Sequence, residues 1–159
     1  MNTIKINFDK LKKDHWSDQE TENAELIIEF VQHIMNNHDF DLVMQKFGDG
    51  PYVQHNRSMQ DGLGGVIESV KQFTSRYPDF SYDVKNMIVD GDLVSIHSHA
   101  TLRKSDRGND TKGLNIIDTW KVKDGNLVEH WDAVQPLEGF MRFYNLVTGG
   151  SIRNSNGGF

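Results

Sequence analysis

The fold is decided by the stretch Gly113-Leu-Asn-Ile-Ile-Asp-Thr-Trp-Lys-Val-Lys-Asp-Gly-Asn-Leu-Val-Glu-His-Trp-Asp-Ala-Val-Gln135. Apolar and polar residues alternate on both sides of Asp124-Gly125, as they do in strands that bury one face. The dipeptide Asp-Gly is a strong turn signal between two such strands. The stretch therefore predicts a β-hairpin, and its apolar face carries ionisable side chains.

One buried-face position in the first strand is an aspartate. Asp118 falls in phase with the apolar residues, which are Leu114, Ile116, Trp120 and Val122. In the second strand, His130 and Asp132 are two positions apart and point to the same side of the sheet. That side also contains Val128 and Val134, and the other side contains Leu127, Glu129 and Trp131. Burying a carboxyl group is costly, so this face is a candidate functional site.

The pairing of the two strands decides whether Asp118 joins this group, because a shift by one residue exchanges the faces. A two-residue Asp-Gly loop would place Asp118 opposite Trp131. A three-residue loop that includes Asn126, closed by a β-bulge, would instead place Asp118 opposite Asp132.

We predict the second register, because it sorts the other residues by polarity. Trp120 then lies opposite His130, and Lys121 pairs with Glu129 as opposite charges in water. The inner face collects the apolar residues Ile116, Trp120, Val122, Val128 and Val134. It also carries two carboxylates and one imidazole.

Two neighbouring carboxylates in an apolar wall cannot both ionise at low cost at neutral pH. We therefore expect either Asp118 or Asp132 to hold a proton with a raised pKa, beside the imidazole of His130. Such a group is suited to general acid–base catalysis. The alternative is that Asp118 only accepts hydrogen bonds within the sheet and holds the strands together.

The composition is that of one globular domain. Of the 159 residues, 36% are hydrophobic and 25% are charged, and the formal net charge is -6. An acidic chain without a basic stripe is not expected to bind nucleic acid or an anionic membrane. Cysteine is absent, which excludes disulfide bonds and thiol chemistry. No apolar run has the pattern of a signal peptide or a membrane span, so we expect a cytoplasmic protein.

Three helices are predicted ahead of the strands. Ser17 and Glu20 have the spacing of a capping box, and apolar residues then recur at helical spacing to about residue 36. A short helix is expected within residues 39–48, and a third is expected from residue 61 to residue 77.

From residue 80 onward the pattern changes to that of strands, over residues 82–89 and 93–102 and then the hairpin. Helices followed by antiparallel strands predict an α+β fold with the helices against one face of a curved sheet. Residues 1–16 are expected to form an N-terminal arm, residues 17–147 a single domain and residues 148–159 a flexible tail.

Two motifs resemble a known family. The segment Tyr52-Val-Gln-His-Asn56, followed by Asp61-Gly62, and the hairpin end Glu129-His-Trp-Asp132 are similar to SnoaL-like polyketide cyclases of the nuclear-transport-factor-2-like superfamily. Bacterial proteins predicted to be SnoaL-like aldol-condensation enzymes share this pattern. The resemblance covers about residues 20–140. It implies a cone in which a bent antiparallel sheet wraps three helices and encloses an apolar pocket.

The resemblance also implies a role for Asp132. In such cyclases an aspartate on the last strand is the general acid–base of an aldol ring closure that uses no metal and no organic cofactor, and Asp132 matches it. A histidine of the cyclases is matched by Asp118, which disfavours rather than favours ionisation of its neighbour. His130 restores an imidazole nearby. Homodimerisation through the outer sheet face, where His97, His99, Thr119 and Trp131 are expected, is implied as well.

Several further residues are candidates for the site. Gln54, His55 and Asn56 lie in a polar loop and have the donors to polarise a carbonyl, or else they cap the following helix. His97 faces away from the aliphatic side of its strand, and a bulge would be needed to turn it toward the pocket. Candidates for the substrate-binding wall are Tyr52, Trp120, Trp131 and Gln135. The histidine and aspartate spacings fit no metal motif, so we predict no metal site.

The sequence therefore predicts a cofactor-free acid–base enzyme that enolises a small, largely apolar carbonyl compound. Asp132 is the expected general acid or base, tuned by Asp118 and His130, with His55 as a further catalytic group. Aldol cyclisation, isomerisation and dehydration all need these parts. The alternative is a non-catalytic protein of the same fold that binds a small molecule.

Overall fold

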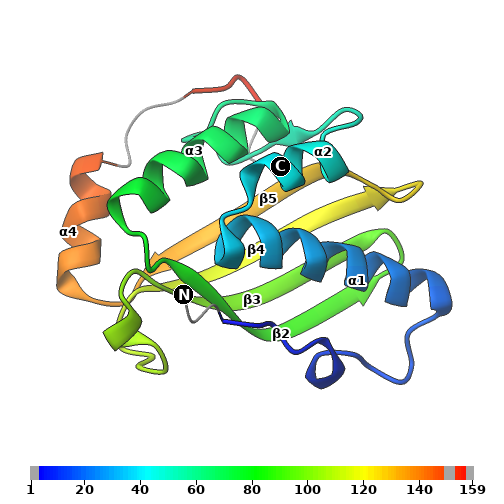
Figure 1. The fold of residues 1–159 in the computed structure, drawn as a ribbon, viewed down its shortest axis with the longest axis horizontal. Helices are drawn as coiled ribbons and strands as arrows, with labels where there is room; N and C mark the ends of the chain where they lie inside the picture. The colour runs from blue at the N-terminus through cyan, green and yellow to red at the C-terminus, as the bar shows by residue number, and fades with distance from the viewer. Residues whose placement is uncertain (1–3, 149–152, 157–159) are drawn as a thin grey trace.

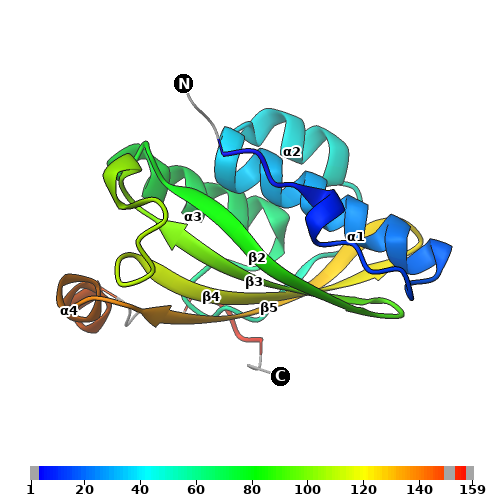
Figure 2. The same cartoon turned by 90° about the horizontal axis from the view of Figure 1, so that it is seen from below.

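The computed structural model describes residues 4–148 and 153–156. Within them, three helices cover one face of a curved five-stranded sheet, and Figure 2 shows these two layers from the side. The predicted α+β class is confirmed, and three helices precede the long strands as predicted. A further helix, α4 (Gly139–Thr148), lies beside the end of the sheet (Figure 1).

Helix α1 (Asp18–Val31) begins at the predicted capping box. The Ser17 hydroxyl accepts from the Glu20 backbone N–H at 3.2 Å, and the Glu20 carboxylate accepts from the Ser17 backbone N–H at 2.8 Å. Both contacts satisfy donors that have no partner within the helix. The helix continues as a π-helical turn, η2 (Gln32–Asn37), so the predicted end near residue 36 agrees with the structure.

Helices α2 (Phe40–Phe47) and α3 (Gly62–Arg76) also lie where the sequence predicted them. The Asp39 side chain accepts from the Leu42 backbone N–H at 3.3 Å and caps α2. None of the helices within residues 4–148 and 153–156 is both long and apolar enough to cross a lipid bilayer.

The strands lie across the sheet in the order β1, β5, β4, β3, β2. Their bounds are β1 (Val53–Gln54), β2 (Ser81–Asp90), β3 (Leu93–Thr101), β4 (Leu114–Lys123) and β5 (Asn126–Pro136). The strands from β2 to β5 are antiparallel as predicted, whereas β1 pairs with β5 in parallel, so the sheet is mixed. Strand β1 is too short to produce a periodic pattern, and the sequence therefore predicted a loop there.

The β4–β5 hairpin has the predicted register at its ionisable residues. Asp118 lies opposite Asp132, and Trp120 lies opposite His130. These pairs place both carboxyl groups and the imidazole on the face of the sheet that the helices cover.

The turn of this hairpin differs from the prediction. The loop has two residues, Asp124 and Gly125, with φ of 51° and 74°, as a type I′ turn requires. The bulge lies further along the strand, at Val128, after Leu127 has paired with Val122. Leu127 is consequently buried at 4% exposure, and Val128 is half-buried, which reverses their predicted placement.

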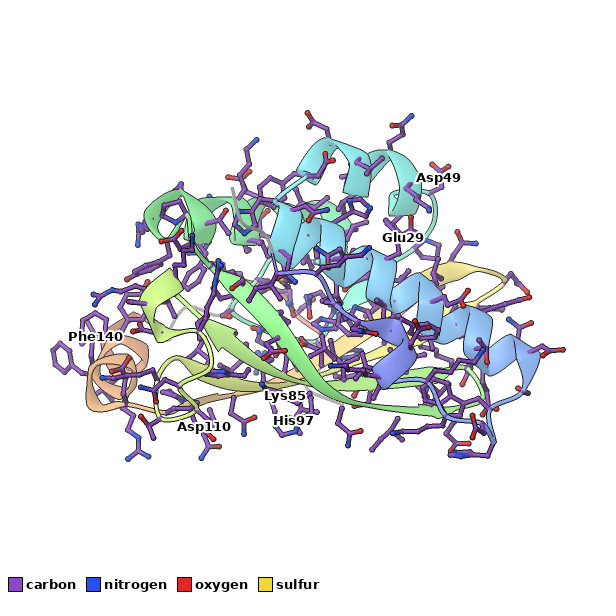
Figure 3. The ribbon with its side chains drawn as sticks, turned by 60° about the horizontal axis from the view of Figure 1, so that its bottom comes forward. Glu29, Asp49, Lys85, His97, Asp110 and Phe140 are labelled. Atoms are coloured by element: carbon purple, nitrogen blue, oxygen red, sulfur yellow. The ribbon has the colours of Figure 1, made fainter. Side chains whose placement is uncertain are left out.

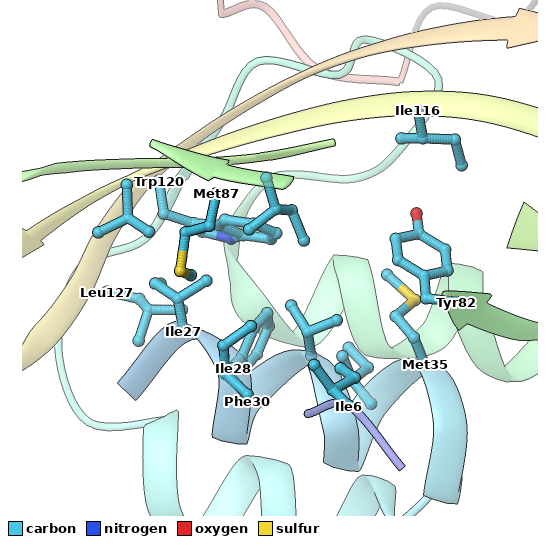
Figure 4. Packing of buried hydrophobic residues seen from close by; sticks show 14 of the residues in the cluster. Ile6, Ile27, Ile28, Phe30, Met35, Tyr82, Met87, Ile116, Trp120 and Leu127 are labelled. Carbon is cyan, nitrogen blue, oxygen red and sulfur yellow. The ribbon is translucent and has the colours of Figure 1, made fainter. Parts of the chain in front are cut away.

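Phe30 joins α1 to the sheet and to α2. Its ring meets Phe47 of α2 and Trp120 of β4 edge to face, with centroids 5.3 and 6.0 Å apart. Figure 4 shows Ile27 and Phe30 of α1 beneath Met87 and Trp120 of the sheet. The core therefore fills the space between α1 and the inner face of the sheet.

The described part of the predicted N-terminal arm belongs to this core. Ile6, Leu11 and Trp16 are buried, and the Ile6 backbone N–H donates to the Gln32 side chain at 2.9 Å. A short 3-10 turn, η1 (Phe8–Lys10), lies between Ile6 and Leu11, and the buried residues attach the segment to the helical layer.

We expect Phe30→Ala to lower the free energy of unfolding by roughly 3–5 kcal/mol, because it removes a fully buried ring and leaves a cavity. Chemical denaturation followed by far-UV circular dichroism measures this. The control is Phe143→Ala on α4, where the ring is 64% exposed and the expected change is within about 0.5 kcal/mol. Equal losses in both variants would contradict the placement of the core.

Candidate active site

The register aligns polar residues in two adjacent rows on the inner face of the sheet. Directly opposite residues share a face, so Asp118 and Asp132 form one row across β4 and β5. The next row contains Trp120, His130 and Gln54, which come from β4, β5 and β1. Strands far apart in sequence thus bring two carboxyls, an imidazole and an amide together.

A cavity of about 490 Å³ adjoins these rows. Its apolar wall is formed by Met35, Met59, Val70, Phe73, Phe80, Leu114, Ile116 and Val134. The polar residues in the wall are Asn56, Ser58, Ser69, Tyr82 and Asp132. Asp132 therefore presents an acidic group to a space of the size that binds small organic molecules.

Asn56 fixes the side chain of Asp132. The Asn56 Nδ2 lies 2.9 Å from Oδ1 and 2.6 Å from Oδ2 of Asp132. The Asn56 Oδ1 accepts from the Ser58 backbone N–H at 3.0 Å, and this contact sets the orientation of the amide because a backbone N–H can only donate. Asn56 is therefore the donor and Asp132 the acceptor.

Gln54 determines which nitrogen of His130 carries a hydrogen. Gln54 Oε1 accepts from the Asn56 backbone N–H at 2.8 Å, which identifies this atom as the amide oxygen. The same oxygen lies 3.1 Å from His130 Nδ1, so Nδ1 is the donor of that contact. His130 Nε2 then faces Asp118, at 3.1 Å from Oδ1.

Asp118 is 2% exposed, and its Oδ2 has no hydrogen-bond partner among the residues that the structure describes. Burial raises the pKa of this carboxyl, the contact with His130 opposes the rise, and the nearby charge of Asp132 adds to it. A hydrogen bond between Asp118 Oδ1 and His130 Nε2 needs one proton between them. The two side chains therefore share one buried proton beside Asp132.

Tyr52, Gln54 and Trp120 lie behind the cavity wall and support this pair. The Trp120 ring stacks on His130 with centroids 4.7 Å apart, and its Nε1 donates to the Tyr52 hydroxyl at 3.2 Å. Burial raises the pKa of Tyr52, which keeps that hydroxyl neutral. The three residues were predicted to contact substrate. In the structure they are buried, are absent from the cavity wall and lie against the Asp118–His130 pair.

Sequence reasoning missed Tyr82, which enters the cavity wall from β2. Its backbone is hydrogen-bonded to Asn36, whereas its hydroxyl has no partner within the described residues. Figure 4 shows the hydroxyl directed toward Ile116. Burial raises the pKa of Tyr82, and the charges of Asp118 and Asp132 raise it further, so the group stays protonated. A tyrosine in phase with apolar strand residues carries no signal of this kind.

Asn56 and Asp132 are the predicted site residues that line the cavity. Besides Asp118, His130 and the three residues behind the wall, four more lie outside it, namely His55, His97, Trp131 and Gln135. Trp131 and His97 occupy the alternate strand positions that point to the opposite sheet face, and Figure 3 shows His97 on the side away from the helices. His55 stacks on Trp131 with centroids 4.9 Å apart, and its Nε2 lies 2.9 Å from Glu129. Gln135 is exposed. These positions favour structural roles, and of the polar loop triplet Asn56 alone is in the wall.

Asp118, His130 and Asp132 each offer one potential ligand atom, and these three atoms lie within 4.8 Å of one another, so the group has the donor set for a metal ion. Most of these donors are engaged with protein partners, since His130 Nε2 bonds Asp118 Oδ1 and both oxygens of Asp132 accept from Asn56, whereas Asp118 Oδ2 has no partner among the described residues. An ion held by His130 Nε2 would have to displace the proton between Asp118 and His130. The observed network is suited to proton transfer without such an exchange.

The sequence matches the SnoaL-like domain family over residues 27–130, and this range is most of the chain. The chain belongs to this family. No protein among those with curated descriptions matches this SnoaL-like protein in sequence. The resemblance of the two motifs is thus confirmed at the level of the family.

Solved structures show the same fold. A proposed polyketide cyclase from Bacillus cereus superposes with a TM-score of 0.62 at 21% identity, over 77% of this SnoaL-like chain and 81% of its own. A proposed SnoaL-like polyketide cyclase from Jannaschia superposes with a TM-score of 0.63 at 14% identity, over 87% and 100%. AclR from Streptomyces galilaeus, a proposed hydroxylase, gives 0.57 at 16% identity, over 82% and 86%. The shared fold is the nuclear-transport-factor-2-like cone, which hosts more than one named activity.

We expect Asp118→Asn to remove a pH-dependent component of stability in this SnoaL-like protein. Because burial raises the pKa of Asp118, the folded state binds the proton more tightly than the unfolded chain does. The contribution is fully present below the unfolded pKa of about 3.9 and is lost as the pH rises through the raised folded pKa. An asparagine does not titrate, so the decline of stability with rising pH above about 4 should be shallower in the variant.

Denaturation midpoints measured from pH 4 to pH 8 test this expectation. Asp90→Asn on β2 is the control, because it removes an exposed carboxylate from the same sheet. Identical pH profiles for the wild type and Asp118→Asn would mean that the Asp118 carboxyl gains no proton on folding.

Proposed function

We propose that this SnoaL-like protein is a cofactor-free acid–base enzyme that enolises a small, largely apolar carbonyl compound. One observation carries the proposal: Asp132 is an acid in the wall of an otherwise mainly apolar cavity, beside a buried pair that holds one proton. Titratable groups that differ in environment and lie side by side in a cavity are suited to proton transfer.

The proposed base is the Asp132 carboxylate. Both of its oxygens accept from Asn56, which holds the group in one orientation and lets an oxygen take a proton from a carbon next to a carbonyl. In this step the C–H bond breaks, an O–H bond forms on Asp132 and the electron pair of the C–H bond moves to the carbonyl oxygen. An enolate results.

The proposed donor to the enolate oxygen is Tyr82. Tyr82 is a buried residue of the cavity wall, and its hydroxyl stays protonated and has no hydrogen-bond partner among the described residues. A donor that is already in place, in a mainly apolar site, stabilises charge as it develops on oxygen. The mainly apolar wall supports a substrate whose remaining surface is hydrocarbon.

The same enolate leads to three reactions. Returning the proton to another carbon is an isomerisation, attack of the enolate on a second carbonyl is an aldol ring closure, and expulsion of a hydroxyl group is a dehydration. In the last two reactions the proton that Asp132 took from carbon passes to the new alkoxide or to the departing hydroxyl, which leaves as water, and Asp132 becomes a carboxylate again. The Asp118–His130 pair would tune Asp132 through its position beside it. The names of the structural neighbours include polyketide cyclases, which supports the aldol reaction as the first to assay.

Homodimerisation through the outer sheet face stays a prediction. Ile88 and Ile117 are 64% and 44% exposed, and Ile117 lies on this face beside His97. Exposed apolar side chains on a sheet without a covering layer are compatible with such an interface.

We expect Asp132→Asn to slow catalysed proton exchange by about 10²- to 10⁴-fold, because the amide cannot act as a base. The assay is deuterium uptake at the carbon next to the carbonyl in a panel of cyclic ketones and β-diketones, followed by NMR. Ligand affinity should stay within roughly tenfold, since the side chain keeps its size. Asp90→Asn is the control and should leave the rate unchanged. A wild type that binds these compounds without any exchange would support the alternative of a binding protein and contradict the enzyme proposal.

We expect Tyr82→Phe to lower the exchange rate by about 10²- to 10³-fold, the usual effect of losing one donor to a developing oxyanion. The variant retains the ring and therefore the shape of the wall. Tyr77→Phe is the matched control, because Tyr77 does not line this cavity. A rate for Tyr82→Phe equal to that of the wild type would remove Tyr82 from the mechanism.

A further inference from the structure

We propose that residues 153–156, near the C-terminus, form a strap that holds the site loop in its working conformation. The site loop is the segment 54–61 between β1 and α3, and Figure 1 shows the strap, drawn in red, beside it. The tail 148–159 was predicted to be flexible, whereas its described part is hydrogen-bonded to this loop. The inference rests on the proposed function in that Asn56 of the loop orients the Asp132 base.

Asn154 donates to two backbone carbonyls of the site loop. Its Nδ2 lies 3.1 Å from the Asn56 oxygen and 3.0 Å from the Met59 oxygen. An amide nitrogen has two hydrogens, so one side chain satisfies both acceptors. The Asn154 Oδ1 accepts from the Asn156 backbone N–H at 3.0 Å, which fixes the orientation of the amide.

Asn156 attaches the strap to the start and the end of the loop. Its Nδ2 lies 2.9 Å from the Gln54 backbone oxygen and 2.9 Å from Asp61 Oδ1. The Gln54 backbone N–H donates to the same Asp61 oxygen at 2.9 Å and holds the pKa of that carboxyl below its usual value. Asp61 is therefore a charged acceptor that ties strap, β1 and α3 together. The Arg153 backbone N–H adds a contact to the Arg57 oxygen at 2.8 Å.

The loop held in this way carries two of the contacts on which the site depends. Gln54 Oε1 accepts from His130 Nδ1, and Asn56 Nδ2 donates to Asp132. The strap asparagines are not in the cavity wall, so they contact neither substrate nor reacting atoms. Asn154 and Asn156 are therefore positioning residues, which act through the backbone of the loop.

The test uses the full-length protein with Asn154→Asp and Ser155→Asp. The first keeps the size of the side chain but replaces the NH₂ group by an oxygen that cannot donate to a carbonyl. The second adds the same charge one position away, at an exposed residue of the strap. Asn154→Ala removes the donor without adding charge, and far-UV circular dichroism verifies that every variant is folded.

Hydrogen exchange of the loop amides is the first readout. The backbone N–H groups of Asn56, Ser58 and Met59 are hydrogen-bonded within the loop. We expect them to exchange about tenfold faster in Asn154→Asp and Asn154→Ala, because the loop opens more often, and at the wild-type rate in Ser155→Asp.

Catalysed deuterium uptake of the ketone panel is the second readout. We expect kcat to fall about tenfold in both Asn154 variants, while KM changes by less than about threefold, because most of the cavity wall lies on α3 and the sheet. Ser155→Asp should match the wild type. A merely structural contact would leave kcat and KM of the folded variants unchanged.

The outcomes separate the strap from the proposed function. Unchanged amide exchange in both Asn154 variants would overturn the strap. Faster amide exchange with an unchanged kcat would overturn its positioning role. Absence of catalysed exchange in the wild type would overturn the proposed function, and the loop amides alone would then decide whether the strap exists.

Discussion

The site depends on the pairing of Asp118 with Asp132 across β4 and β5. A shift of one residue would turn one carboxyl away from the other, since neighbouring positions on a strand point to opposite faces. With a two-residue turn and regular pairing, Asp118 would lie opposite Trp131. The extra, unpaired residue Val128 shifts the pairing by one position, so that Asp118 lies opposite Asp132. A local irregularity in the backbone therefore decides the electrostatics of the cavity.

Once the register is set, hydrogen bonding assigns the protons. Backbone N–H groups of Asn56 and Ser58 can only donate, so they orient the amides of Gln54 and Asn56. Gln54 then requires a hydrogen on His130 Nδ1, and Asn56 requires Asp132 to accept. The remaining proton is confined between Asp118 and His130, where burial favours the neutral carboxyl. The network therefore places the proton shared by Asp118 and His130 beside the Asp132 carboxyl group, whose two oxygens accept from Asn56.

Membership of the family accounts for the cone-shaped fold and its cavity, but it does not determine which reaction takes place there. Proteins that share this fold at low identity are named as polyketide cyclases and as a hydroxylase. Function is set by the groups that reach the cavity. In this chain the polar groups in the mainly apolar wall are Asn56, Ser58, Ser69, Tyr82 and Asp132. Asp132 is bonded to Asn56 of the loop to which residues 153–156 are bound.

The amino-acid sequence by itself determined the helices, the long strands, the hairpin and the partnership of Asp118, His130 and Asp132. These features depend on local periodicity and on the sorting of polar from apolar positions between paired strands, which a sequence displays directly. Lys121 lies opposite Glu129 as predicted, although their side chains contact Asp92 and His55 respectively. Only the tertiary structure decided that His55 and Trp131 stack outside the cavity, that Tyr82 enters it, and that Asn154 reaches the site loop. Those outcomes depend on contacts between segments far apart in the chain. Such contacts are fixed by the parallel pairing of β1 with β5 and by the curvature of the sheet, neither of which leaves a periodic trace in the sequence.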